Sequence, residues 1–217
     1  MRYKAVIFDL DGVICSTDEY HYRAWKSIAD ELGIPFDRSV NEKLRGVSRM
    51  ESLNIILSQC GNTMDESGKL RCVEKKNDLY REMLKKMSPD DLDGETARTL
   101  QILRAQGLKL AIGSSSKNTG FILQQIGLGD FFDAVSDGNN ISHSKPDPEV
   151  FLKAADMLQT AYADCLVVED AEAGIQAAER AGMDSAAIGY AANAKLGMYQ
   201  LTRFSDLLET VNEQVAK

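Results

Sequence analysis

The chain has 217 residues, 44% hydrophobic and 27% charged, as expected for one globular core that carries an insertion. A formal net charge of −8 disfavours nucleic acid and anionic membranes as partners, and no stretch approaches the roughly 18 apolar residues of a membrane span. The N-terminus does not resemble a signal peptide, and the cysteines (Cys15, Cys60, Cys72, Cys165) form no CxxC pair that would indicate a disulfide framework or a zinc site. We therefore expect a cytoplasmic protein.

Short apolar segments separated by helical patterns predict parallel strands that are buried on both faces of an α/β sheet. These segments are 5–8, 108–112, 134–135 with its flanks, 166–168 and 186–188. Helical patterns end at glycines, as helices commonly do. They cover 20–32, 99–106, 121–126 and 171–181. The alternation predicts a doubly wound parallel-sheet core.

A long helical segment interrupts this alternation. Roughly 70 residues without a strand separate the first strand from the helix near residue 95, far more than a βα connection needs. We expect residues 16–87 to form an inserted helical cap, and residues 1–15 and 88–217 to form the core. The last cap helix has a predicted apolar stripe of Leu70, Val73, Tyr80, Leu84 and Met87.

Polar residues follow the first strand, at the sheet edge where open α/β sheets bind ligands. Asp9 and Asp11 can present their carboxylates to one pocket, because Gly12 allows the backbone to turn sharply. One carboxylate can attack phosphorus, while the other transfers protons to and from the reacting oxygens. An acidic turn without catalytic function is the alternative.

Three further segments should reach the same edge. Glu169 and Asp170 supply the oxygen ligands that Mg²⁺ prefers, although Asp170 could instead only cap the helix that follows it. The turn at 114–118 can hold phosphate oxygens with hydroxyl and backbone N–H groups, or can simply cap its helix. Lys145, before Pro146, can hold an ammonium over a transferring phosphoryl group, or lie at the surface.

The sequence FDLDGV at 8–13, together with Ser114, Lys145 and the Glu169–Asp170 pair, resembles in order and spacing the four motifs of the haloacid dehalogenase superfamily. The resemblance spans nearly the whole chain, including the small helical cap. It implies that Asp9 is the phosphorylated nucleophile and Asp11 the acid and base, with Ser114 and Lys145 holding the transferring phosphate. It also implies a site for one Mg²⁺ ion, formed by Asp9, Asp11, Glu169 and Asp170.

Three segments resemble the β-phosphoglucomutase family more narrowly: TDEYHYRAW at 17–25, LRGVSR at 44–49 and SSSKN at 114–118. That family implies interconversion of β-glucose 1-phosphate and glucose 6-phosphate. The reaction passes through β-glucose 1,6-bisphosphate, which also primes the enzyme. Mg²⁺ is required throughout.

The same resemblance implies roles for cap and loop residues. Arg49, Ser116 and Asn118 would clamp the distal phosphate, which suits bidentate guanidinium geometry. Thr17 and His21 would couple cap closure to the alignment of Asp11. The remaining predicted substrate contacts are Trp25, Arg45, Gly46, Val47, Lys76, Ser115 and Lys117.

Several of these residues have simpler interpretations. His21 and Trp25 share one helical stripe and could be packing residues, and Lys76 could lie on a solvated face. Ser48 with Glu51 fits a capping box, so we assign Ser48 to helix initiation. Arg45 stands where the family frequently has lysine, which leaves the sugar specificity open.

We therefore expect a phosphomutase, acting as a monomer on small-molecule sugar phosphates. The main alternative is a phosphatase of the same superfamily that hydrolyses small sugar phosphates, because a fold does not fix the acceptor. A sensor without catalysis is a third reading, and it would not need the nucleophile, acid, lysine and metal carboxylates together.

Overall fold

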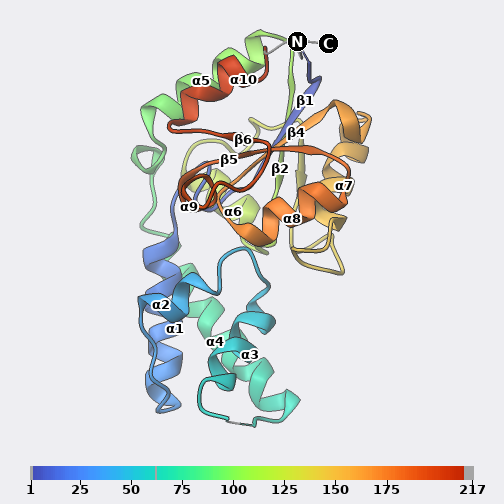
Figure 1. The fold of residues 1–217 in the computed structure, drawn as a ribbon. Helices are drawn as coiled ribbons and strands as arrows, with labels where there is room; N and C mark the ends of the chain where they lie inside the picture. The colour runs from blue at the N-terminus through green and yellow to red at the C-terminus, as the bar shows by residue number, and fades with distance from the viewer. Residues whose placement is uncertain (1, 62, 213–217) are drawn as a thin grey trace.

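The computed structural model describes residues 2–61 and 63–212, so the first residue and the last five of the predicted core lie outside the described residues. The described strands form one parallel sheet in the order β3-β2-β1-β4-β5-β6 (Figure 1). Their bounds are β1 (Ala5–Phe8), β2 (Lys109–Gly113), β3 (Ala134–Ser136), β4 (Cys165–Glu169), β5 (Asp184–Ala187) and β6 (Tyr199–Gln200).

Helices cover both faces of the sheet and also form a separate group. Their bounds are α1 (Asp18–Glu31), α2 (Arg38–Glu42), α3 (Arg49–Ser58), α4 (Glu66–Leu84), α5 (Gly94–Ala105), α6 (Thr119–Gln125), α7 (Glu149–Met157), α8 (Glu172–Arg180), α9 (Gly189–Asn193) and α10 (Leu207–Thr210). Short 3₁₀ helices lie at η1 (Pro89–Asp91), η2 (Tyr162–Asp164) and η3 (Phe204–Asp206). In the part of the chain that the structure describes, we find no helix with both the length and the apolar character of a membrane span.

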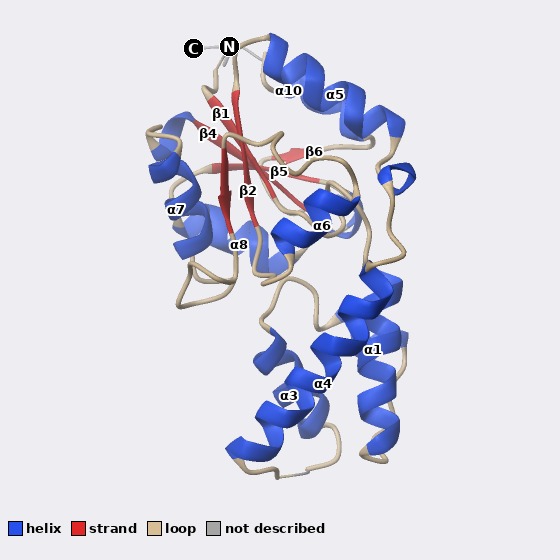
Figure 2. Cartoon of the chain, turned by 180° about the vertical axis from the view of Figure 1, so that it is seen from behind, coloured by secondary structure: helices blue, strands red, loops and turns tan. Residues whose placement is uncertain are grey.

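The central strand β1 is fully buried because its side chains alternate between two helical layers. Val6 and Phe8 pack in a cluster with residues of α5, α6 and α10, whereas Ala5 and Ile7 pack against α7 and α8. Figure 2 shows these helices on opposite sides of the sheet. The predicted doubly wound α/β core is confirmed.

Helices α1 to α4 pack mainly on one another, and we call them the helical unit; Ala24 of α1 and Tyr80 and Leu84 of α4 also join the core cluster of Val6 and Phe8. The hydrophobic cluster of the helical unit contains Trp25, Ile28, Leu53, Ile56 and Val73. Both views place this unit beyond one end of the sheet, where the loop after β1 leads into α1 (Figures 1 and 2). The unit falls within the segment predicted as a cap.

The structure departs from the predicted elements in several places. The strand β6 and the helices α7, α9 and α10 have no counterpart among the predicted elements, because β6 is too short to show a pattern and no glycine directly follows these helices. Leu70, predicted on the apolar stripe of α4, is 51% exposed, because it lies near the start of the helix and outside the cluster of the helical unit. The predicted helix stops at Gly107 and Gly182 are confirmed by positive φ angles of 85° and 69°.

Two glycines give a matched test of the core packing. A Cβ on Gly113, at the end of β2, would lie 2.7 Å from the Phe151 ring, whereas a Cβ on Gly120, within α6, would meet nothing within 4 Å. We expect Gly113→Ala to lower the free energy of unfolding by about 1–3 kcal/mol through overpacking. Gly120→Ala should raise it by about 0.5–1 kcal/mol through helix propensity. Urea unfolding measures both, and shifts of the same sign would contradict the packing described.

Candidate active site

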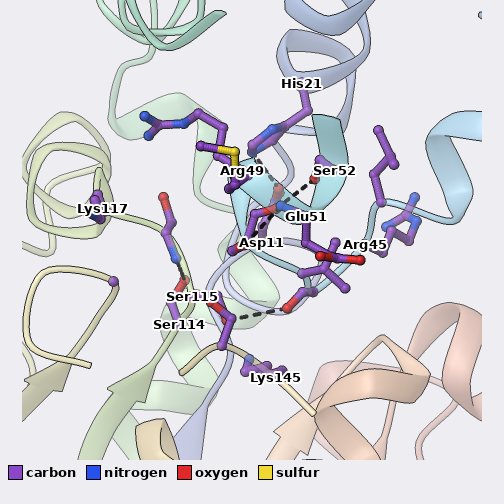
Figure 3. Close-up of a pocket in the computed structure, with 18 of the residues that line it drawn as sticks. Asp11, His21, Arg45, Arg49, Glu51, Ser52, Ser114, Ser115, Lys117 and Lys145 are labelled. Atoms are coloured by element: carbon purple, nitrogen blue, oxygen red, sulfur yellow. Dashed lines mark hydrogen bonds and ion pairs between the residues drawn. The ribbon is translucent and has the colours of Figure 1, made fainter. Parts of the chain in front are cut away.

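A cavity of about 880 Å³ lies between the carboxyl edge of the sheet and the helical unit. Figure 3 shows His21, Arg49 and Ser52 from the helical unit on one side of Asp11, and Ser114 and Lys145 from the core on the other. The two parts of the chain therefore share one site. This is the edge at which parallel α/β sheets bind ligands.

The deepest part of the site is a buried charge cluster. Lys145 donates hydrogen bonds from Nζ to Asp9 Oδ1 and, over 2.6 Å, to Glu169 Oε1. The Lys145 side chain is 0% exposed, and a cis peptide bond joins it to Pro146. Burial acts to lower the pKa of Lys145, but the two carboxylates raise it above its ordinary value, so the lysine is charged. Burial also raises the pKa of Asp9, against the attraction of Lys145.

Asp11 is held by the start of the helical unit. The Thr17 backbone N–H donates to Asp11 Oδ1 over 2.6 Å, and the Thr17 hydroxyl donates to Oδ2 over 2.8 Å. The Tyr80 hydroxyl lies 2.7 Å from the same Thr17 oxygen, and because that hydroxyl already donates, Tyr80 must be the donor. Burial and the nearby Asp18 raise the pKa of Asp11 to about 6, a value suited to giving and accepting protons near neutrality.

His21 lies between Lys76 and Asp11. Its Nδ1 lies 2.8 Å from Lys76 Nζ, and its Nε2 lies 3.5 Å from Asp11 Oδ2. Burial, and then the charges of Lys76 and nearby arginines, lower the pKa of His21 well below its ordinary value. Burial, and then the charge of Arg49, also lower the pKa of Lys76, whose amine donates to Nδ1 in the His21 tautomer that carries its proton on Nε2. Lys76 is itself 1% exposed, so the alternative of a solvated lysine is wrong.

Asp170 lies against the backbone that follows Asp11. A Cβ on Gly12 would come within 2.2 Å of Asp170 Oδ2, so only glycine permits this approach. The Arg45 guanidinium reaches across from the helical unit to Asp170 Oδ2 over 3.0 Å and also pairs with Asp18. Asp170 makes no capping hydrogen bond to α8, so the N-cap alternative is wrong.

These residues form an acidic centre that suits a divalent cation. Burial, and then the neighbouring charges of Glu169 and Asp9, raise the pKa of Asp170. The acidic centre contains the carboxylates of Asp9, Asp11, Glu169 and Asp170. The cations in contact with them are Lys145 and Arg45. With all four carboxylates ionised, negative charge remains after both cations are counted, and Arg45 is also shared with Asp18 and Glu42, so one Mg²⁺ ion would offset part of this charge. Oxygen donors of this kind are those that Mg²⁺ prefers.

Glu169 takes a different position from the other acidic residues. Its Oε1 accepts from Lys145, its Oε2 accepts from the Ala171 N–H over 2.8 Å, and the residue does not line the cavity. It therefore lies behind Lys145. The other predicted metal-site residues, Asp9, Asp11 and Asp170, line the cavity.

Arg49 and the loop that contains Ser116 and Asn118 also line the cavity. The half-buried Arg49 guanidinium has no ion pair with a carboxylate anywhere in residues 2–61 and 63–212, and burial lowers the pKa of the group. Ser116 accepts a hydrogen bond from the Asn118 backbone N–H over 3.1 Å. Ser48 accepts from the Glu51 backbone N–H over 3.2 Å, which confirms that Ser48 caps α3.

The structure brings most predicted site residues together. Those that line the cavity are Asp9, Asp11, His21, Trp25, Arg45, Gly46, Val47, Arg49, Lys76, Ser114, Ser115, Ser116, Lys117, Asn118, Lys145 and Asp170. Thr17 and Glu169 do not line the cavity; Thr17 donates to Asp11, and Glu169 accepts from Lys145. Trp25 packs in the cluster of the helical unit, as its simpler interpretation has it, and also lines the cavity, so its contact with substrate stays a prediction.

Comparison with known proteins gives the family. The model of the haloacid dehalogenase-like hydrolases matches residues 3–182. The chain belongs to the haloacid dehalogenase-like hydrolase family. The superfamily resemblance predicted from the motifs is therefore confirmed.

Individual members of the family differ in their named activities. The chain is 45% identical to the β-phosphoglucomutase of Bacillus subtilis, over 86% of this chain and 83% of that protein. It is 30% identical to a fructose-1-phosphate phosphatase of Escherichia coli, over 85% of this chain and 95% of that protein. The crystal structure of a Clostridium difficile β-phosphoglucomutase matches with a TM-score of 0.93 and 34% identity, covering 99% of this chain and 100% of that one.

The sequence did not predict that Tyr80 belongs to the site. The tyrosine was predicted only as part of the apolar stripe of α4, and it is indeed buried. A buried tyrosine normally needs a partner for its hydroxyl, and this requirement could have pointed to a polar role. That partner, Thr17, lies 63 residues away in sequence, so only the fold identifies it.

Removing the Tyr80 hydroxyl should weaken the support of Asp11. We expect Tyr80→Phe to lower the rate of the transfer step about 5- to 30-fold, since one buried hydrogen bond contributes roughly 1–2 kcal/mol. The control is Tyr22→Phe, because the Tyr22 ring packs on Phe36 without a side-chain hydrogen bond among the described residues. Steady-state assay measures both variants, and equal rates for Tyr80→Phe and wild type would contradict the role of the hydroxyl.

Proposed function

We propose that this protein is a β-phosphoglucomutase, which interconverts β-glucose 1-phosphate and glucose 6-phosphate. The proposal rests on the family, on the identity with the Bacillus subtilis enzyme of that name and on the structural match with the Clostridium difficile enzyme. The geometry of the cavity supports the proposal independently, because it offers groups for two phosphates.

The observation that carries the proposal is that one cavity is lined by two groups of residues suited to phosphate, which we assign to a reactive and a distal phosphate. At the reactive end, Lys145 and the loop of Ser114 surround Asp9. We assign the distal end to Arg49, which has no ion pair among the described residues and lines the cavity together with the loop 114–118. A phosphatase needs only the reactive end, whereas a mutase must hold a bisphosphate in either orientation.

In the proposed reaction Asp9 carries the phosphoryl group between sugars. β-Glucose 1,6-bisphosphate first phosphorylates Asp9 and so primes the enzyme. Asp11 then takes the proton of the sugar 6-hydroxyl as that oxygen attacks phosphorus and the bond to Asp9 breaks, which forms the bisphosphate. After the bisphosphate turns around, Asp9 attacks the phosphorus on O1, and Asp11 returns the proton to the leaving oxygen.

We propose that Asp9, Asp170 and the backbone carbonyl of Asp11 hold one Mg²⁺ ion, with Glu169 adding negative charge behind them. When bound, the ion would neutralise charge on the transferring phosphoryl group. Lys145 would stabilise the same charge, because its ammonium lies beside Asp9, to which it donates. Ser114 contributes a hydroxyl to the transferring phosphate.

Residues 16–87 act in this proposal as a cap whose closure aligns Asp11. The hydrogen bonds of Thr17 to Asp11 cross the junction between the core and α1, and His21 approaches the same carboxylate. Movement of α1 would therefore change the orientation of Asp11, which would restrain transfer to water while the cavity is open. We expect Trp25, Arg45, Gly46, Val47, Lys76, Ser115 and Lys117 to contact the sugar and its phosphates, and the enzyme to be a cytoplasmic monomer.

The test is to follow both products in one sample that contains β-glucose 1-phosphate, Mg²⁺ and a trace of β-glucose 1,6-bisphosphate. We expect glucose 6-phosphate to form well ahead of inorganic phosphate, because the distal clamp favours sugar over water as the acceptor. Omission of the bisphosphate should introduce a lag. Inorganic phosphate as the sole product would instead identify a phosphatase.

Two substitutions separate the ends of the cavity. Asp9→Asn should abolish mutase turnover and phosphate release together, since the amide cannot form the phosphoenzyme. Arg49→Ala should lower mutase kcat/KM about 100-fold, because a charge-assisted bidentate contact contributes roughly 3 kcal/mol, but should leave hydrolysis of acetyl phosphate. Mutase activity retained by Asp9→Asn would disprove the assignment of the nucleophile.

A further inference from the structure

The side chain of Asn118 is held from the helical unit. Asn118 precedes α6, is buried, and makes no side-chain capping hydrogen bond to that helix. Its amide instead meets two residues of α4: Nδ2 donates to Asn77 Oδ1 over 2.9 Å, and Oδ1 accepts from Arg81 Nη1 over 3.2 Å. The two partners of the amide, Asn77 and Arg81, thus lie one helical turn apart on α4.

The chemistry of Arg81 fixes which way the amide points. A guanidinium has donors and no acceptor, so only the amide oxygen can face it. The amide nitrogen must then face Asn77, and Asn118 is one of the residues that line the cavity. Asn77 alone could not impose this orientation, because an asparagine side chain both donates and accepts. The Arg81 guanidinium also lies over the Phe121 ring, 5.0 Å from its centroid, which restrains its own position.

One donor of the amide remains available. The Asn118 nitrogen carries two hydrogens, and Asn77 accepts only one of them. The donation from Arg81 to the amide oxygen also polarises the amide and strengthens its remaining N–H as a donor. The result is a donor for an anion beside Ser116.

We propose that Arg81 is a positioning residue for the distal phosphate, acting through Asn118 with the help of Asn77. The inference rests on the proposed function, because it requires a second phosphate at this end of the cavity. Arg81 belongs to α4 and Asn118 to the core, so the amide is oriented only while the helical unit lies against the core. The contact therefore completes the distal site on closure.

A graded series at Arg81 tests the orientation. Arg81→Lys keeps a group that only donates, Arg81→Met removes the polar contact, and Arg81→Glu supplies a group that only accepts and so favours the flipped amide. Lys85→Met is the matched control, since Lys85 is an exposed cation one turn further along, paired with Glu82. Circular dichroism and thermal unfolding would verify that each variant folds.

The readouts are KM and kcat for β-glucose 1-phosphate, and the rate at which acetyl phosphate, which has no distal phosphate, phosphorylates Asp9. We expect KM to rise about 5-fold in Arg81→Met and about 10-fold or more in Arg81→Glu, as for the loss of one or two hydrogen-bond contributions. The KM of Arg81→Lys should stay within about 3-fold of wild type. None of the variants should change the rate at which acetyl phosphate phosphorylates Asp9.

Three results would overturn the proposal. A KM in Arg81→Glu equal to that of Lys85→Met would show that the amide orientation does not matter. Equal slowing of phosphorylation by acetyl phosphate would show a general structural effect of Arg81. A wild-type enzyme that releases only inorganic phosphate would contradict the proposed function itself, and the positioning role would fall with it.

Discussion

The buried ammonium of Lys145, between the carboxylates of Asp9 and Glu169, is the interaction on which the site depends. Three charges can be buried at the sheet edge only because each is paired, and removal of one partner from such a group is strongly destabilising. The pairing fixes the Asp9 carboxylate at the end of β1. Because the ammonium is held by carboxylates on both sides, it also stays charged, as the stabilisation of a phosphoryl group requires.

A second constraint is the excess of negative charge around that pairing. Gly12 allows Asp170 to approach the backbone after Asp11, and the Arg45 guanidinium from the helical unit compensates only part of the resulting charge. The same arginine pairs with Asp18 at the start of α1. The charge balance of the core is thereby linked to the position of the helical unit, which is consistent with a site that assembles when the two parts meet.

Much of this arrangement could be predicted from the sequence, because the relevant residues follow strands. Short buried strands with polar ends are local patterns, so the positions of Asp9, Asp11 and Lys145 at one edge follow from the parallel fold. The contacts within the helical unit could not be predicted in this way. Whether Lys76 faces solvent or His21 depends on how α4 rotates against α1, and the sequence pattern of α4 is rich in lysines on more than one face.

The missed contacts have the same physical origin. Tyr80 and Arg81 act on partners 63 and 37 residues away, through groups whose orientation depends on the packing of α4 against the core. Periodicity assigns such residues to a face but does not identify the atom they meet. The position of Glu169 behind Lys145 could not be predicted either, because adjacent carboxylates after a strand give no indication of which one turns inward.

In the proposed reaction one cavity holds both phosphates, so that the phosphorylated enzyme transfers its phosphoryl group to the sugar in preference to water. The most direct test is a single turnover. Enzyme phosphorylated at Asp9 by acetyl phosphate would be mixed rapidly with β-glucose 1-phosphate and Mg²⁺, then quenched at intervals. We expect β-glucose 1,6-bisphosphate to form before any inorganic phosphate, and the sugar to accelerate the loss of the phosphoenzyme. Release of inorganic phosphate at the rate observed without sugar would contradict it.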